Sequence, residues 1–246
     1  MKDPDAAAVS VNVVSAVMQQ YKQWYRLSDL FQKQSLPGTK EALLDRMAYR
    51  GALTIDTIIR NSVFSAGGSS LVGGTAIART SMQRNSSFQI DIGEIREGVR
   101  RLRKDNVPTF GNGLYVGILN PVAEYDLESD SSWTNYITYT DKGIEQMYSG
   151  RIGTSFGVEF YVTTQAKTIT DGASAGASAN VVQTYIMGNE FYGVVKPGDV
   201  EVIIKDPFPG SPLNSYSAYG WKLWMVAKQL RSTRMVRLED VASVDL

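Results

Sequence analysis

The sequence predicts an α+β protein in which the first and last segments fold together around an inserted central part. Helical and strand patterns follow one another without a regular β-α-β repeat, which is typical of α+β proteins. Shifts in composition near residues 90 and 200 indicate the limits of the insertion. A chain of 246 residues, 43% hydrophobic and 20% charged, is long and apolar enough to bury a core.

The N-terminal elements are predicted from alternation and aromatic density. Residues 6–18 are apolar, but acidic residues before them and polar residues within them argue against a secretion signal. Val9, Val11 and Val13 alternate with polar residues, which predicts a strand. An aromatic passage then runs to Ser28 and Asp29, where we expect a turn or a helix start. No stretch of the sequence approaches the ~18 uninterrupted apolar residues of a membrane span.

A long helix is predicted from residue 39 to about residue 63, after a break at Pro37 and Gly38. Thr39 is the expected N-cap. At ~1.5 Å per residue the helix would be ~37 Å long. Gly51 in its interior predicts close packing at that point. The apolar face consists of Leu44, Met47, Ala48, Gly51, Ile55, Ile58 and Ile59.

A Gly/Ser-rich stretch, residues 66–87, predicts a mobile loop or an extended connection. It lacks the Lys-Ser/Thr pair of a phosphate loop, so nucleotide binding is rejected there. A second helix is predicted from Asp91 to about Asp105. Asp91 is its expected N-cap, and Glu94 completes an Asp variant of the capping box.

The rest of the chain predicts short strands and two short helices. The expected strands are residues 114–119, 158–163, 181–187, 200–205, 220–230 and 235–241. The expected helices are residues 120–129, with proline at the first helical position, and 141–148. A flexible low-complexity loop is expected at residues 171–178.

The side-chain inventory favours a structural role over catalysis. The sequence has no cysteine and no histidine. Thiolate chemistry, thiolate metal sites and the Ser-His relay are therefore excluded, and acid–base catalysis is left to carboxylates, Lys, Tyr or Ser-Lys pairs. Lys plus Arg equals Asp plus Glu at 25 each, so net charge gives no overall attraction to nucleic acid. We expect no catalytic residue, no cofactor and no metal.

Two acidic groups raise the possibility of a carboxylate dyad: Glu124, Asp126, Glu128 and Asp130, and the pair Glu239 and Asp240. The first group is spaced by two residues on a presumed helix, which spreads its members around the helix axis. A solvated acidic face is the favoured interpretation of these residues.

The strongest basic cluster lies on the second predicted helix and consists of Arg96, Arg100, Arg101, Arg103 and Lys104. A solvated helix face with cations near its C-terminus explains the cluster. Contact with an acidic neighbouring subunit or with nucleic acid is the functional alternative.

A resemblance to a known family enters at the C-terminus. The run at residues 218–239, which begins Ala218-Tyr-Gly-Trp-Lys-Leu-Trp224, resembles the ending of major capsid proteins of tailed bacteriophages in the N4 gp56-like family. Other blocks are similar to that family in the same order and extend the resemblance over about residues 18–241. These blocks are residues 20–30, 92–108, 114–121 and 150–160.

The resemblance implies an HK97-like major capsid fold. It would have a peripheral (P) domain in residues 1–90 with a spine helix at 39–63, an axial (A) domain in residues 91–199, and closing P-domain strands in residues 200–246. The implied role is a structural subunit of an icosahedral shell. Pentamers and hexamers would enclose packaged double-stranded DNA, without sequence-specific contacts to that DNA.

Further expectations follow from the same resemblance. Scaffold, portal and decoration proteins are implied partners, and no membrane is. The protein would be part of the virion capsid, assembled in the bacterial host cytoplasm. Family members carry an N-terminal arm and an extended E-loop before the aromatic block, where this sequence has about twenty residues. We expect those elements to be absent, removed or outside this sequence.

Three alternatives stay open at this point. The same fold also forms the shells of enzyme-loading nanocompartments. A His-free hydrolase would use the carboxylates of residues 124–130, with two of them ~5–10 Å apart in a cleft. A DNA-binding module would act through the basic cluster at residues 96–104, with steep salt dependence.

Overall fold

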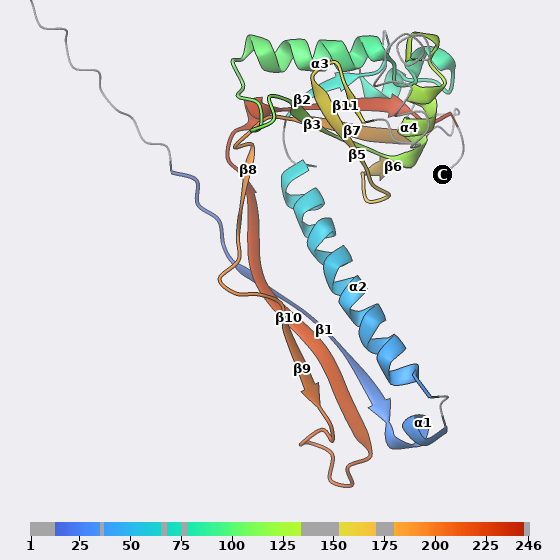
Figure 1. The fold of residues 1–246 in the computed structure, drawn as a ribbon, viewed down its shortest axis with the longest axis vertical. Helices are drawn as coiled ribbons and strands as arrows, with labels where there is room; N and C mark the ends of the chain where they lie inside the picture. The colour runs from blue at the N-terminus through green and yellow to red at the C-terminus, as the bar shows by residue number, and fades with distance from the viewer. Residues whose placement is uncertain are drawn as a thin grey trace, which may run out of the picture.

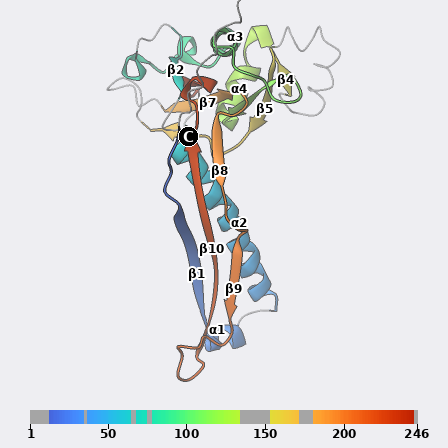
Figure 2. The same cartoon turned by 90° about the vertical axis from the view of Figure 1, so that its left-hand side faces the viewer.

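The computed structural model describes residues 13–34, 37–64, 68–74, 78–133, 153–170 and 180–243. It has a long lower part, in which a helix lies along a narrow sheet, and a compact upper part with a second sheet (Figure 1). In the view turned by 90°, the lower part is a narrow arm and the helices and strands of the upper part gather at its end (Figure 2).

The lower sheet is built around a 14-residue strand, β10 (Tyr216–Gln229). The whole length of β1 (Gln19–Ser28) pairs antiparallel with one edge of β10, from Tyr216 to Met225. On the other edge, β9 (Glu201–Lys205) pairs with the first half of β10 and β8 (Tyr192–Val195) pairs with its end. The sheet therefore joins segments from the two ends of the chain.

The helix of the lower part is α2 (Thr39–Ile59), which has 21 residues and continues as a π-helical segment, η1 (Arg60–Phe64). Its N-cap is Gly38 at φ 88°, so the prediction of Thr39 as N-cap is wrong by one residue. The chain enters the helix through a left-handed turn that favours glycine. The close packing predicted at Gly51 is confirmed, because a Cβ there would lie 3.6 Å from the Trp221 ring.

Polar contacts fix the far end of the lower part. α1 (Asp29–Gln34) begins where β1 ends, as expected, and the N–H of Asp29 donates to the carbonyl of Ser215. Asp206 accepts hydrogen bonds from the Ser217 hydroxyl, from Lys40 Nζ at 2.9 Å and from the Tyr219 hydroxyl at 2.9 Å. These donors lower the pKa of Asp206 to about 2.

The upper sheet has the strand order β2-β11-β7-β3-β5-β4, with β6 also paired to β7. β2 runs parallel to β11 and β3 runs parallel to β5, whereas the other pairs are antiparallel. The strands are β2 (Ser69–Val72), β3 (Tyr115–Leu119), β4 (Thr154–Ser155), β5 (Val158–Val162), β6 (Thr168–Ile169), β7 (Val181–Met187) and β11 (Met235–Val241).

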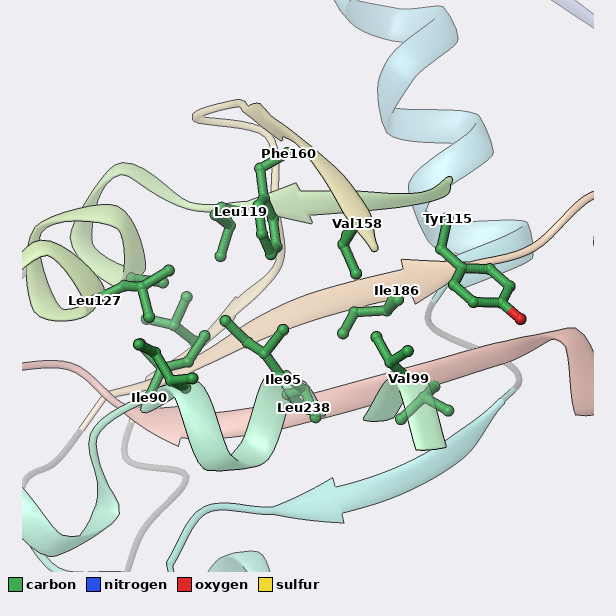
Figure 3. Close-up of a cluster of buried hydrophobic side chains, with 14 of the residues drawn as sticks. Ile90, Ile95, Val99, Tyr115, Leu119, Leu127, Val158, Phe160, Ile186 and Leu238 are labelled. Atoms are coloured by element: carbon green, nitrogen blue, oxygen red, sulfur yellow. The ribbon is translucent and has the colours of Figure 1, made fainter. Parts of the chain in front are cut away.

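One face of this sheet is covered by α3 (Ile92–Lys104), which buries Ile95, Val99 and Leu102 against it. Figure 3 shows these contacts, with Ile95 and Val99 pointing toward the sheet strands that carry Ile186 and Leu238. α4 (Pro121–Glu128) follows β3 and adds Leu127 to the same core. No helix in the described ranges is long and apolar enough to cross a membrane.

The N-terminus of α3 confirms half of the predicted capping box. The Asp91 carboxylate accepts from the N–H of Glu94 at 2.7 Å, as expected. The Glu94 carboxylate instead accepts from the N–H of Gly74 at 2.6 Å, so its partner comes from a different segment. The helix expected at residues 120–129 and the strands at 181–187 and 235–241 are confirmed within one or two residues.

Other predictions need correction. Of the residues that predicted a first strand, Val9 and Val11 lie outside the described residues, and residues 13–18 have no regular structure. The first strand in the described part of the chain lies over the aromatic passage at 19–28. The stretch 66–87, expected to be a loop or connection, contains β2 and two 3-10 turns, η2 (Arg79–Ser81) and η3 (Ser86–Phe88). The helix expected at 141–148 and the loop at 171–178 lie outside the described residues.

Candidate functional site

The predicted basic cluster lies on the solvent face of α3. Arg96, Arg100 and Arg103, four and three residues apart, share one side of the helix and line a hollow of about 400 Å³. Val99 and Phe156 complete its lining. Guanidinium groups around an apolar floor suit a carboxylate or a phosphate group, because their planar donor forks match both anions.

Only part of this cluster is neutralised within the chain. Arg100 donates to Glu97 through Nε at 2.6 Å and through NH2 at 2.7 Å, and Arg101 Nε donates to the same carboxylate at 3.2 Å. These contacts, with Arg100 the stronger, hold the pKa of Glu97 down to about 2. Among the described residues no carboxylate pairs with Arg96 or Arg103, so an external anion can still bind them.

The acidic residues of α4 do not form the solvated face that was predicted. Asp126 is buried and accepts from the N–H of Ser243. Asp130 accepts from the N–H groups of Ile92 and Ser132. Glu128 is exposed, and burial raises the pKa of Glu124. Two of the four carboxylates therefore satisfy backbone donors.

The prediction of a solvated face is also wrong for Glu239 and Asp240, which are each only 2% exposed. They are consecutive residues of β11 and therefore point to opposite faces of the sheet. Glu239 accepts from Arg79 and from Gln183, whereas Asp240 lies on the side of α3. Sequence reasoning could not find this burial, because consecutive carboxylates near a chain end are usually exposed.

Apolar side chains are exposed along the lower part. The predicted aromatic groups divide between core and surface: Trp221 is 4% exposed, whereas Trp24 is 62% and Trp224 is 47% exposed. Val202 and Ile204 of β9 are half exposed and, with Ala52 of α2, line a hollow of about 510 Å³ between the helix and the strand edge. Apolar surface of this extent usually marks an interaction site.

Neither the cluster on α3 nor the acidic groups hold a metal-type arrangement. No three acidic side chains within the described part of the chain are placed so that they could bind a metal ion together. The surface features are thus basic or apolar patches on a long molecule.

Comparison with known proteins identifies the fold. No family model matches the chain, and no curated protein matches it in sequence. Among solved structures, the capsid of Ralstonia phage GP4 superposes with a TM-score of 0.67 at 12% identity, covering 94% of this chain and 75% of that one. The capsid of cyanophage Pam1 gives a TM-score of 0.66 at 13% identity, covering 93% of this chain and 76% of that one. The chain has the HK97-type capsid fold.

The HK97-type fold is also found in an encapsulin. The holo-SrpI encapsulin complex from Synechococcus elongatus superposes with a TM-score of 0.51 at 14% identity, covering 93% of this chain and 75% of the encapsulin chain. The encapsulin match is weaker than both phage capsid matches. At these identities the comparisons establish the fold alone.

Proposed function

We propose that the chain is a structural subunit of an icosahedral phage capsid, in the N4 gp56-like family, and that it assembles into pentamers and hexamers around packaged double-stranded DNA. The HK97-type capsid fold is the observation that carries this proposal. The exposed apolar side chains of the lower part support it, since a shell subunit needs contact surfaces on several sides. Assembly would take place in the host cytoplasm, with scaffold, portal and decoration proteins as further partners.

In this proposal the lower part is the peripheral domain and the upper part is the axial domain. α2 and η1 would form the spine helix, and β1, β9 and β10 would form the peripheral sheet. The pairing of β2 and β11 with β7 would place these two strands in the axial domain. The sequence predicted that the axial domain begins at residue 91 and ends before residue 200. α3 and β9 would follow this division, whereas β2 and β11 would not.

Electron microscopy of the purified full chain tests the proposal. We expect rings of five and six subunits, or tubes and closed shells, to form as protein concentration rises. Sedimentation would report the same transition from subunit to large assembly. A protein that stays monomeric over the whole accessible concentration range, with and without a crowding agent, would contradict the proposal. Closed shells that exclude DNA and load a cargo protein would instead favour the nanocompartment alternative.

We further propose that the α3 basic face, defined as Arg96, Arg100, Arg101, Arg103 and Lys104, contacts an acidic surface of a neighbouring subunit. The guanidinium groups of Arg96 and Arg103 around the hollow, which pair with no carboxylate in the described part of the chain, support this contact. Direct binding of DNA phosphates by the same residues is the alternative.

Reversing the charge of this face separates these two possibilities. We expect the double variant Arg96→Glu/Arg103→Glu to fold normally and to assemble at least about tenfold less well, because opposite-charge contacts become repulsive. The matched variant Arg96→Lys/Arg103→Lys keeps the charge and should assemble far better. Sedimentation at several salt concentrations measures both. Unchanged assembly of the Glu variant, with loss of salt-dependent DNA binding, would favour the DNA alternative.

A hydrolase receives no support from the carboxylates proposed for it. Asp126 and Asp130 are bonded to backbone N–H groups of different segments, Ser243 for one and Ile92 for the other. Glu128 lies at the exposed end of α4. A pair of catalytic carboxylates must face one substrate across a cleft, whereas Asp126 and Asp130 are bonded to separate backbone segments.

A further inference from the structure

Two carboxyl groups meet in the interior of the upper part, where α3 packs against β11. Asp240 of β11 is 2% exposed, and its carboxyl group lies beside that of Glu94, on the first turn of α3. Among the described residues no donor reaches either Asp240 oxygen, and none reaches Glu94 Oε2. Glu94 Oε1 is occupied by the N–H of Gly74.

A proton between the two carboxyl groups would supply the donor that these buried oxygens lack. Ionised carboxylates only accept hydrogen bonds, so two of them cannot bond to each other. One proton between them converts the contact into an O–H···O⁻ hydrogen bond, which is short and strong. The neighbouring residue Glu239 needs no such proton, because the guanidinium group of Arg79 neutralises its carboxylate. Arg79 NH2 and Nε donate to the two Glu239 oxygens at 2.5 and 2.8 Å. Within the described residues no cation pairs with Glu94 or Asp240.

Among the described residues, the surroundings contribute negative charge, and no cation pairs with the two carboxyl groups. On α3, Asp91 faces the pair, and on β11, Glu239 adds a further negative charge. On β7 the residue paired with Asp240 is the uncharged Val182, and residues 71–74 carry no titratable group. Asp126 of α4 and Asp130, just after α4, are bonded to backbone N–H groups, while Arg79 and Arg237 are turned toward Glu239.

The pair also connects three segments. Glu94 fixes α3, Asp240 fixes the end of β11, and the bond from Gly74 fixes the turn after β2. Gly73 is packed so closely that a Cβ would lie 2.8 Å from Asp240 Oδ1. Two negative charges in this space could not move apart without displacing one of these segments.

We propose that Glu94 and Asp240 share one proton and act as a pH-sensitive latch that holds α3 and the Gly73–Gly74 turn against β11. The latch is closed while the proton is bound and is weakened when the proton is lost. This inference goes beyond the proposed capsid function and does not depend on it, because it concerns the folded subunit alone.

The direction of the pH effect follows from linkage. Burial is the main cause that raises the pKa of Asp240 well above its ordinary value and also raises that of Glu94. In the unfolded chain both groups titrate near ~4. Between that value and the folded values the native protein holds more protons than the unfolded chain, so stability falls as pH rises through this window. One extra proton corresponds to about a tenfold fall in the folding equilibrium constant per pH unit.

Denaturant unfolding of the full chain over pH ~5 to ~9 tests the latch. We expect wild-type stability to fall within this range. Asp240→Asn and Glu94→Gln should each flatten the profile, since an amide N–H replaces the shared proton as donor. Glu97→Gln is the matched control on the same helix. The Glu97 pKa is lowered, so its contribution is lost only in acid, and this variant should keep the wild-type slope.

A carboxyl-carbon NMR titration of the wild-type protein gives a readout that needs no variant to fold. We expect one carboxyl of the pair to stay protonated at a pH where Glu97 is fully ionised. Hydrogen exchange at the Gly74 and Glu94 amides should accelerate as that carboxyl titrates. Ordinary titration of both carboxyls near ~4, or a wild-type stability that is flat over the whole range, would overturn the proposal.

Discussion

Replacing Glu239 by alanine is expected to lower the free energy of unfolding by about 3 kcal/mol, the low end of the cost of breaking a buried ion pair, because the Arg79 side chain is still 35% exposed. Glu239 is 2% exposed and accepts from Arg79 Nε at 2.8 Å, from Arg79 NH2 at 2.5 Å and from Gln183 Nε2 at 2.9 Å. Arg237 Nε lies 2.9 Å from the same carboxylate. Its removal would leave two guanidinium groups facing each other across the sheet surface.

Glu190→Ala is the matched control for this prediction. Glu190 pairs with Arg234 at 2.8 Å, but its side chain is 63% exposed. Removal of such an exposed ion pair should cost no more than about 1 kcal/mol. Denaturant unfolding of both variants at neutral pH measures the difference. A loss in Glu239→Ala no greater than in Glu190→Ala would mean that water replaces the carboxylate at the sheet surface.

Replacing Trp221 by alanine is expected to lower the free energy of unfolding by about 3–5 kcal/mol, because it opens a cavity between α2 and the lower sheet. Trp221 is buried in the core that includes Met47 of α2 and Leu223 of β10. A Cβ atom added to Gly51 of α2 would lie 3.6 Å from the Trp221 ring.

Two other substitutions make this prediction specific. Trp224→Ala changes the same residue type three positions along β10, but Trp224 is half exposed, so we expect a loss of about 1 kcal/mol or less. Trp221→Phe should also lose less, since the buried indole N–H has no acceptor among the described residues. Thermal and denaturant unfolding, with tryptophan fluorescence, measure all three variants. Equal losses in Trp221→Ala and Trp224→Ala would show that α2 does not depend on this contact.

The proposed function connects both predictions to assembly. If α2 and the lower sheet form the peripheral domain of a shell subunit, Trp221→Ala should impair ring and shell formation in proportion to its loss of stability. Glu239→Ala should act on the upper part and leave the exposed apolar surface of the lower part unchanged. Comparing the two by electron microscopy at matched folded fractions would separate effects on folding from effects on contact surfaces.

Elements with local signals were predicted well. Asp91 caps α3, proline begins α4, and alternation or apolar runs located β7 and β11. These signals act within a few residues of the chain, so they survive in any tertiary context. β1 was not predicted as a strand because Trp24 lies on its outward face, and this large aromatic residue hid the alternation of Tyr21, Tyr25 and Leu27 on the inward face.

The candidate sites also differ in whether the sequence could predict them. The basic cluster on α3 could be read from the sequence, because i, i+4 and i+7 spacing on a helix places Arg96, Arg100 and Arg103 on one side. The hollow beside α2 and β9 could not, since it depends on how the helix lies against a strand far away in the chain.

The sequence by itself determined the helices, most of the strands, the absence of histidine and cysteine chemistry, and the resemblance to capsid proteins. Tertiary structure alone decided that β2 and β11 share a sheet, that Glu239 meets Arg79, and that Asp240 meets Glu94. The physical reason is how far apart in the sequence the interacting residues lie. Caps and periodicity are set by neighbours in the chain, whereas the burial and charge state of a carboxyl group depend on residues that only folding brings beside it.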